Sequence, residues 1–376
     1  MTLTDYSSSP DLEKTPQGVV ILDYADLSSQ KDLTQHIQEG LGNSPRALGI
    51  LLVRQVPGLQ AAREKALIKS LEHARLSPEH QEETAHPQSN YLTGWSLGKE
   101  WVNQKPDISK GSFYANPLQT APIQTTEEQR ARFPVYLHDN RWPRPELISG
   151  FQEAFCDLGR LIHSVGLDLA RHCDSYIAQH IPKEARVNLV EALQGSATTK
   201  GRLLHYYSLG ENACSGKQEE EEEEDSWCGW HVDHSFLTGL TSPRYTRGEE
   251  EEEVKAAELD APSLRIRDRS GHLHPISIPQ DCLAFQLGQA LELASQGHLL
   301  ATYHCVRRPS DPSLSRDTFA LFLQPPLDSL VLQRDNPNKK DFGLFSPSST
   351  MTFGEYTEEV VGRHHIKSHL LEKDGE

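Results

Sequence analysis

The stretch WHVDHSFLTGL, residues 230–240, decides the fold of this chain, because it lies within one of several short apolar segments that alternate with turns. Turns such as 268–271 are of the kind that join hairpin strands. A series of short strands of this type predicts a jelly-roll or a barrel. The segments expected to form strands are 203–209, 228–240, 264–267, 274–278, 282–287, 299–306 and 318–323.

Upstream of these segments the apolar pattern is helical. Residues 149–173 carry one apolar stripe at spacings of three and four, which predicts a long helix packed against a sheet. Nearer the start, 33–41 and 61–74 are expected to be helices, 19–22 and 48–53 strands, and 85–145 long ordered loops. The predicted fold class is therefore α+β and mainly β, a jelly-roll core with flanking N-terminal helices and a long supporting helix.

The predicted organisation has four parts. A flexible tail precedes an α/β region that packs on the core, and a C-terminal extension with a helix at 356–371 follows the supporting helix and jelly-roll core. The parts are 1–16, 17–145, 146–325 (with acidic loop insertions at 211–226 and 243–262) and 326–376.

Composition limits the possible functions. Two acidic runs, 219–225 and 249–253, supply twelve negative charges, and without them the formal net charge of −17 would be −5. We interpret the runs as solvated loops, with an acidic docking site as the alternative. The acidic balance argues against nucleic-acid binding. The sequence shows no run of 18 apolar residues and no secretory signal, so we expect a cytoplasmic protein without a membrane span, most simply a monomer.

A candidate metal site lies in the opening stretch. On a strand, side chains two residues apart point to the same face, so His231 and Asp233 can bind one ion together. His304, on a later strand, offers a second imidazole. Two histidines and one carboxylate leave three adjacent coordination positions open, which is typical of non-haem iron(II) oxygenases, whereas zinc prefers a closed tetrahedral set. His234 should point away from the ion, and Cys305 is expected to pack in the interior.

A third element, Arg316 with Thr318, opens the strand that follows His304. A buried guanidinium and a hydroxyl on the same face can bind a carboxylate through charge-assisted hydrogen bonds. A dicarboxylate that chelates iron at one end needs such an anchor at its other end. Arg307 and Arg308 could compete for this role, but they lie too near His304 and precede a proline-rich loop.

With these motifs the sequence resembles the iron(II)/2-oxoglutarate-dependent oxygenases of the isopenicillin-N-synthase-like branch. The resemblance covers roughly residues 18–325. It is carried by the His-x-Asp-x-Ser-x-x-Thr-x-Leu strand at 231–240, by the segments 264–271, 286–288 and 295–306, by the Arg-x-Thr pair at 316–318 and by the N-terminal segments 91–94 and 107–114.

The resemblance implies a double-stranded β-helix core, with iron(II) held by His231, Asp233 and His304 and with 2-oxoglutarate and O₂ as co-substrates. It also implies that Arg316 and Thr318 hold the far carboxylate of 2-oxoglutarate, assisted by Tyr207. The chain departs from the family pattern in three places. His205 stands where Asn is common, Thr318 where Ser is common and Cys305 where Arg is common.

Aromatic residues of the N-terminal half are candidates for a substrate pocket or, equally, for the structural core. The candidates are Trp95, Trp101, Phe113 and Tyr114, together with His205. His272, His274 and His298 are expected in or beside turns and exposed to solvent.

The predicted activity is oxidation, by default hydroxylation, of a small organic substrate, with release of succinate and CO₂. Desaturation and ring closure are the other outcomes of the same chemistry. Two alternatives stay open: an iron-dependent oxidase that does not use 2-oxoglutarate, and a catalytically silent β-helix protein that only binds.

Overall fold

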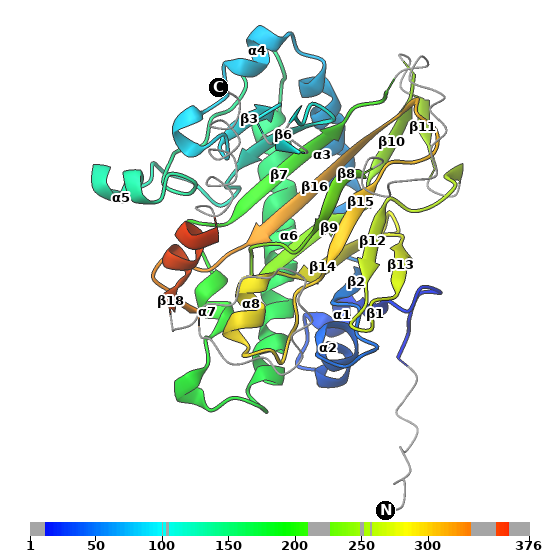
Figure 1. Cartoon of the computed structure of the whole chain (residues 1–376), viewed down its shortest axis with the longest axis vertical. Coiled ribbons are helices and arrows are strands. Elements are labelled where there is room, and N and C mark those ends of the chain that lie inside the picture. Colours follow the sequence, from blue (N-terminus) through cyan, green and yellow to red (C-terminus); the bar gives the residue numbers. More distant parts are fainter. Residues whose placement is uncertain are drawn as a thin grey trace, which may run out of the picture.

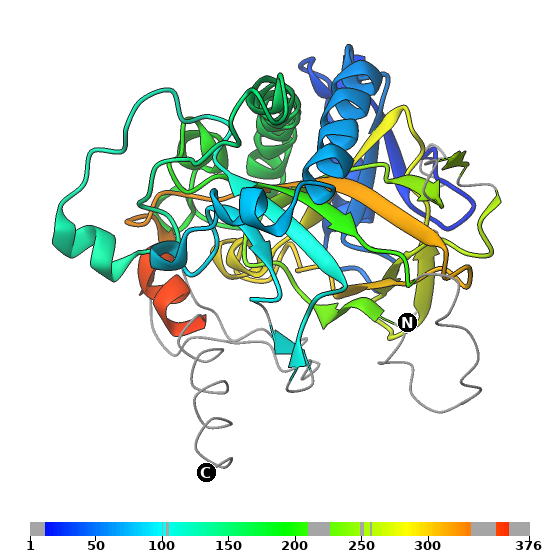
Figure 2. The same cartoon turned by 90° about the horizontal axis from the view of Figure 1, so that it is seen from above.

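The computed structural model describes residues 12–99, 101–102, 105–209, 226–248, 252–255, 258–331 and 351–360, with the backbone alone at 101, 102, 105 and 226. Its centre is a ten-stranded sheet, the major sheet, with a four-stranded minor sheet on one side and the long helices on the other (Figures 1 and 2). Within both sheets the strands pair antiparallel, except for β1 with β2. These layers confirm the predicted jelly-roll class.

The strands of the major sheet follow one path, from which a hairpin branches. In order across the sheet they are β1 (Val20–Asp23), β2 (Ile50–Arg54), β14 (Cys282–Leu287), β9 (Leu237–Thr241), β16 (Leu314–Leu323), β7 (Lys200–Tyr206), β6 (Lys110–Ala115) and β3 (Gly94–Leu97), with β10 (Arg244–Arg247) on β16 and β11 (Glu252–Val254) on β10. The minor sheet has the order β13 (Leu273–Ile276), β12 (Leu264–Arg267), β15 (His304–Arg307) and β8 (Ser226–His231). Two small pairs are β4 (Trp101–Val102) with β5 (Lys105–Pro106) and β17 (Leu330–Val331) with β18 (Met351–Thr352).

The helices surround the sheets, and residues 353–360 are also helical. The helices are α1 (Tyr24–Leu27), α2 (Thr34–Leu41), α3 (Leu59–Ala74), α4 (Pro78–Glu82), α5 (Glu127–Arg132), α6 (Phe151–Ile177), α7 (Leu189–Leu193) and α8 (Gln289–Ala294), with short 3₁₀ turns at η1 (Pro87–Ser89) and η2 (Lys183–Ala185). Among the described helices, none combines the length and the apolar character that crossing a membrane requires.

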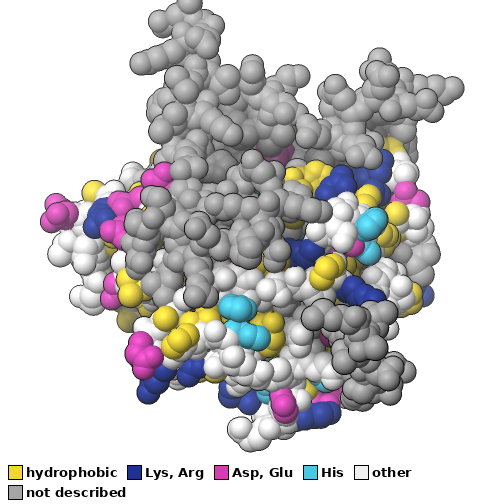
Figure 3. All heavy atoms as spheres, turned by 60° about the horizontal axis from the view of Figure 1, so that its bottom comes forward, with side chains coloured by type: hydrophobic (Ala, Val, Ile, Leu, Met, Phe, Trp, Pro, Cys, Tyr) yellow, Lys and Arg dark blue, Asp and Glu magenta, His cyan; other side chains and the backbone are white. Residues whose placement is uncertain are grey.

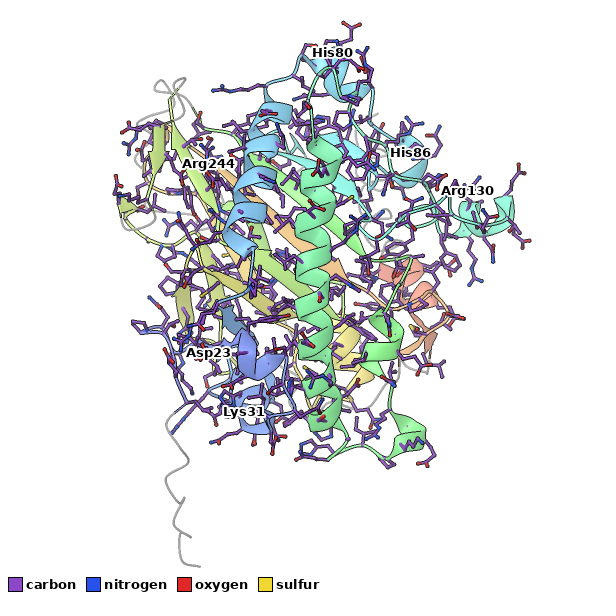
Figure 4. All side chains as sticks on the ribbon, turned by 180° about the vertical axis from the view of Figure 1, so that it is seen from behind. Asp23, Lys31, His80, His86, Arg130 and Arg244 are labelled. Atoms are coloured by element: carbon purple, nitrogen blue, oxygen red, sulfur yellow. The ribbon has the colours of Figure 1, made fainter. Side chains whose placement is uncertain are left out.

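Helix α6 supports the major sheet as the apolar stripe predicts. Figure 4 shows α3 and α6 side by side across the back of the sheet. The stripe is buried from Phe151 to Ile177, four residues beyond the predicted end. Two glycines of the sheet permit this close packing: a Cβ at Gly239 would lie 2.3 Å from Ile162, and one at Gly201 would lie 2.8 Å from Phe155. The supporting face of the sheet and α6 therefore form one continuous apolar core.

Three sequence expectations are corrected. The region 85–145 contains strands β3 and β6, which extend the major sheet, although it was expected to be loops. The expected single strand 228–240 is two strands, β8 and β9, in different sheets. The expected acidic loop 243–262 contains the hairpin of β10 and β11, which continues the sheet beyond β16.

The surface carries no single dominant charge in the described part of the face that Figure 3 shows. Acidic, basic and apolar side chains are interspersed there. Five of the cysteines, Cys156, Cys173, Cys228, Cys282 and Cys305, are free thiols, while Cys214 and the acidic run 219–225 lie outside the described residues.

Candidate functional site

Two histidines face each other across the minor sheet. His231 is the last residue of β8 and His304 the first of β15, and the antiparallel register places them directly opposite one another. Their ring centroids are 4.3 Å apart. The pairing of two strands that are distant in the sequence thus brings together the two predicted imidazole ligands.

Asp233 completes the set from a loop. Strand β8 ends at His231, so the expectation that both residues lie on one strand is wrong. The chain turns after His231 and places Asp233 Oδ1 3.7 Å from His231 Nε2 and 3.9 Å from His304 Nε2. Two atoms that each lie about 2.1 Å from one ion are at most about 4.2 Å apart. Both separations therefore allow a shared ion, and these three residues form a potential metal-binding group.

Backbone carbonyls fix the orientation of both imidazoles. His231 Nδ1 lies 2.7 Å from the carbonyl oxygen of Gly229, and His304 Nδ1 lies 2.9 Å from that of Thr302. Because a carbonyl can only accept, each Nδ1 carries the proton and donates it. Each Nε2 then presents its lone pair toward Asp233. This is the tautomer that metal-binding histidines use.

The second oxygen of Asp233 is held away from the ion position. Oδ2 accepts hydrogen bonds of 2.6 Å from the Thr238 hydroxyl and of 2.6 Å from the Gln286 amide. Burial alone would raise the pKa of this carboxyl, but the two imidazoles and these hydrogen bonds hold the pKa below its usual range. Burial lowers the pKa of His304 to about 4, so this ring is neutral at physiological pH. A carboxylate and a neutral imidazole are the forms that bind metal.

The roles of Thr238 and Gln286 were not predicted from the sequence. Both belong to motifs that were recognised, but a motif does not tell which atoms touch. Strands β9 and β14 are neighbours in the major sheet, and Gln286 pairs directly with Thr238. Only this pairing shows that both side chains reach the same carboxylate oxygen.

A cavity between the two sheets joins the three ligands to Arg316 and Thr318. Arg316 is almost fully buried, and among the described residues its Nε and Nη1 have no hydrogen-bond partner. Its guanidinium carbon lies 5.0 Å from the ring centre of Tyr206. Unpartnered buried donors are costly in a folded protein. The arrangement therefore fits an anionic group bound at this end of the cavity.

Tyr207 and His205 do not line this cavity, which corrects two assignments. Tyr206 lies opposite Arg316 in the ladder between β7 and β16 and shares its face. His205 lies on the other face, where its Nδ1 is 2.8 Å from Asp317 Oδ1 in a buried pair. The ring of Tyr207 packs against His205 at 4.6 Å. A shift of one residue along a strand exchanges the faces, so Tyr206 takes the place expected for Tyr207.

The aromatic candidates divide between the two faces. Trp95 and Phe113 belong to the apolar core beneath the sheet, not to the cavity. Tyr114 lies on the cavity side, with the guanidinium of Arg202, a cavity-lining residue, 5.0 Å from its ring centre. The side chain of Trp101 lies outside the described residues.

The remaining candidates lie away from the ligand cluster. Cys305 is buried, as expected for a packing residue. His274 lies in β13, beside the turn at 268–271, and contacts Asp268 at 2.9 Å. The guanidinium of Arg308 lies 5.2 Å from the ring centre of Trp227, outside the set that lines the cavity.

The donor set fits iron(II). The ligands are two imidazole nitrogens and one carboxylate oxygen on one side of the ion position, and the other side faces the cavity. Two histidines and one carboxylate form the facial arrangement of non-haem iron(II) sites. At the other end, the guanidinium nitrogens of Arg316 without a partner among the described residues fit an anionic group such as a carboxylate.

No protein-family model matches the sequence, and no curated protein matches it as a relative. Solved structures match over nearly the whole chain. A 2OG-Fe(II) oxygenase family protein of Caulobacter crescentus is 19% identical, with a TM-score of 0.65 over 92% of this chain and 98% of that one. A full-length protein of Neurospora crassa, in complex with α-ketoglutarate, is 16% identical, with a TM-score of 0.63 over 96% and 100% of the two chains.

The dioxygenase for auxin oxidation of rice is 15% identical, with a TM-score of 0.54 over 92% of this chain and 95% of that one. These likenesses show that the chain has the fold of the 2-oxoglutarate-dependent iron oxygenases, as the sequence resemblance implies. The isopenicillin-N-synthase-like branch stays a prediction.

Proposed function

We propose that the chain is a non-haem iron(II), 2-oxoglutarate-dependent oxygenase that oxidises, most simply hydroxylates, a small organic substrate with release of succinate and CO₂. The observation that carries the proposal is Arg316. Its buried Nε and Nη1 lack a partner in the described part of the chain, and it lines the same cavity as the three side chains of the candidate metal site. A lone metal site would not need a guanidinium in this position.

His231, Asp233 and His304 would hold the iron. Bound there with 2-oxoglutarate, iron(II) would activate O₂, which supplies the oxidising equivalents that cleave a C–H bond. The protein fixes the ligands in advance, since Gly229 and Thr302 orient the imidazoles. Thr238 and Gln286 occupy Oδ2 of Asp233, so the carboxylate offers one oxygen to the ion.

Arg316 and Thr318 would bind the distal carboxylate of 2-oxoglutarate. The guanidinium neutralises its charge and fixes its direction, while the hydroxyl of Thr318 can donate a further hydrogen bond. The cavity around them is largely apolar, with Leu264, Ile276 and Val306 among its lining residues. Apolar walls exclude water and strengthen the ion pair.

The substrate is proposed to be a small molecule that approaches from the side of His231. This side chain is 38% exposed, whereas those of Asp233 and His304 are 8% and 7% exposed. Similar structures support small substrates: one structure of the Neurospora protein contains thymine, and the rice protein is a dioxygenase for auxin oxidation.

The test is 2-oxoglutarate turnover by the purified chain reconstituted with iron(II) under anaerobic conditions. On admission of O₂ we expect succinate formation coupled to O₂ uptake, stimulated by the true substrate within a panel of small molecules. The Arg316→Met variant should retain iron but lose this turnover at moderate 2-oxoglutarate concentration. O₂ uptake without succinate would favour the oxidase that uses no 2-oxoglutarate, and failure to bind iron(II) would favour the silent binding protein.

A further inference from the structure

The C-terminal segment, residues 351–360, packs against the loop that carries Asp233. The ring of His234, next to Asp233, stacks on Tyr356 with 4.4 Å between centroids and 6° between planes. The same ring lies 5.1 Å from that of Phe353. His234 therefore points away from the metal site, as expected, and its ring packs against the C-terminal segment.

Hydrogen bonds add to this contact on both sides of Asp233. His234 Nε2 and the Thr357 hydroxyl are 2.8 Å apart. The Tyr356 hydroxyl donates to Gln289 Oε1 at 2.8 Å, and the backbone N–H of Gln289 donates to the carbonyl oxygen of Asp233 at 2.8 Å. Gln289 is the first residue of α8, beside which the segment lies in Figure 1.

The C-terminal segment is packed at this point rather than resting on the surface. Phe353 and Tyr356 are 0% and 1% exposed, and Thr357 is also buried. A Cβ at Gly354 would lie 2.8 Å from the ring of Phe133, which shows how closely the segment approaches its neighbours. The segment therefore packs in the interior of the protein, against the loop that carries Asp233.

We propose that residues 351–360 form a positioning element for the metal site, so that docking of this segment and metal binding at His231, Asp233 and His304 stabilise each other. The inference rests on the metal site of the proposed function. Asp233 lies outside the strands, so no sheet ladder fixes its backbone. Ligands must be held to within about 0.5 Å for productive coordination. The stack on His234 and the bond from Gln289 supply that constraint, and thermodynamic linkage makes the effect reciprocal.

The first test is cobalt(II) affinity, measured by titration of the metal-free chain and followed by the visible absorption of the bound ion. His234→Ala and Tyr356→Ala should each weaken binding about tenfold, the lower end of the effect of residues that orient metal ligands. Tyr356→Phe keeps the stack and removes the bond to Gln289, so its loss should be smaller. Circular dichroism confirms that each variant is folded.

The matched control is Glu358→Gln, two residues from Tyr356. Glu358 forms an ion pair with Arg132 at 3.0 Å, and both side chains are exposed. Its replacement should leave cobalt(II) affinity unchanged. If folded Tyr356→Phe and His234→Ala both bind cobalt(II) as tightly as the wild type, the inference is wrong, while the proposed iron site is untouched.

The second test asks whether metal binding stabilises the docked C-terminal segment, the reverse of the effect measured in the first test. Hydrogen exchange of the amides in 353–360 should slow when cobalt(II) is added to the wild-type chain, and this protection should be lost in His234→Ala. Unchanged exchange in the wild type would overturn the linkage. A wild-type chain that binds no cobalt(II) at all would instead overturn the metal site on which the proposed function depends.

Discussion

The two faces of strands β7 and β16 serve different purposes, although they come from alternate residues of the same strands. The helix-covered face carries Leu203, Phe319 and Leu321, which belong to the apolar core against α3 and α6. The cavity face carries Tyr206, Arg316 and Thr318. The alternation of side chains along a strand thus separates the residues that stabilise the fold from those that bind ligands.

The faces also differ in what their polar groups can contact. On the helix-covered face, His205 and Asp317 pair with one another, while Asp317 Oδ2 finds no partner among the described residues. On the cavity face, two nitrogens of Arg316 likewise find none there, but this residue lines the cavity, where a ligand can reach it. Since a buried polar group without a partner costs free energy, Arg316 lowers the stability of the ligand-free chain and favours binding. Substitutions on the two faces should therefore have opposite signatures, one on stability and the other on ligand binding.

The largest effect is expected for Asp233→Ala at the metal end of the cavity. Loss of the only carboxylate ligand should reduce succinate formation at least about a thousandfold, or about 4 kcal/mol. The free energy of unfolding of the metal-free chain should change little by comparison. Asp311→Asn, at a surface carboxylate that pairs with Arg247, is the control and should keep full turnover. Retained turnover in Asp233→Ala would place the metal elsewhere.

Phe319→Ala should have the opposite effect, a loss of stability with little change in metal binding. Phe319 is fully buried and stacks edge-on against Phe155 of α6 at 4.9 Å. Removing a buried aromatic ring costs about 3–5 kcal/mol of unfolding free energy, which chemical denaturation measures. Metal affinity of the folded protein should be retained. Phe322 on the same strand lines the cavity and is only partly buried, so Phe322→Ala should cost less stability. Equal losses at both positions would refute the division of the faces.

Arg316→Met should weaken 2-oxoglutarate binding about a hundredfold, or about 3 kcal/mol, because one end of the dicarboxylate loses a buried charged partner. The ligand-free chain should be as stable as the wild type or more stable, since an apolar side chain replaces an incompletely bonded guanidinium. Calorimetry measures the first effect and denaturation the second. Arg247→Met, at an exposed ion pair, should alter neither. Destabilisation without loss of affinity would assign Arg316 to the scaffold.

The sequence predicts the larger features of this arrangement because they rest on strong patterns. The stripe of α6 specifies a helix and its buried face, and the His-x-Asp pair, the later His and the Arg316/Thr318 pair together indicate His231, Asp233 and His304, which the structure brings together. It is harder to predict on which face of the sheet a side chain lies, because the alternation along a strand depends on where the strand begins. The sequence favours Tyr207 as the cavity residue, but Tyr206, one position earlier, lines the cavity.

The strands β3 and β6 could not be predicted for a related reason. They are short and lie among turns and prolines, and they become strands because β6 pairs with β7 and β3 with β6 at the sheet edge. Trp95 and Phe113 then pack beneath the sheet with α6. Similarly, the contact between His234 and Tyr356 joins residues that are distant in sequence, and neither belongs to a pattern that indicates the other.

A buried histidine of α3, which covers this face of the sheet, should make the free energy of unfolding depend on pH. His73 of α3 is buried against Trp95, Phe113 and Phe151, with ring centroids 4.5, 5.4 and 5.5 Å away. Neither ring nitrogen has a hydrogen-bond partner. Burial lowers the pKa of His73 from 6.5 to about 4. The ring is therefore neutral in the folded protein over most of the acidic range.

The unfolded chain takes up this proton near pH 6.5 and the folded protein only near pH 4. Between these values the unfolded state binds more protons, so the free energy of unfolding falls as the pH falls. From pH 7.5 to 5 the contribution is about 2 kcal/mol. His73→Leu should remove this part of the acid sensitivity without loss of stability at pH 7.5, as denaturation at the two pH values would show. An unchanged pH dependence would mean that His73 is protonated in the fold, and that the helix-covered face can accommodate a charge.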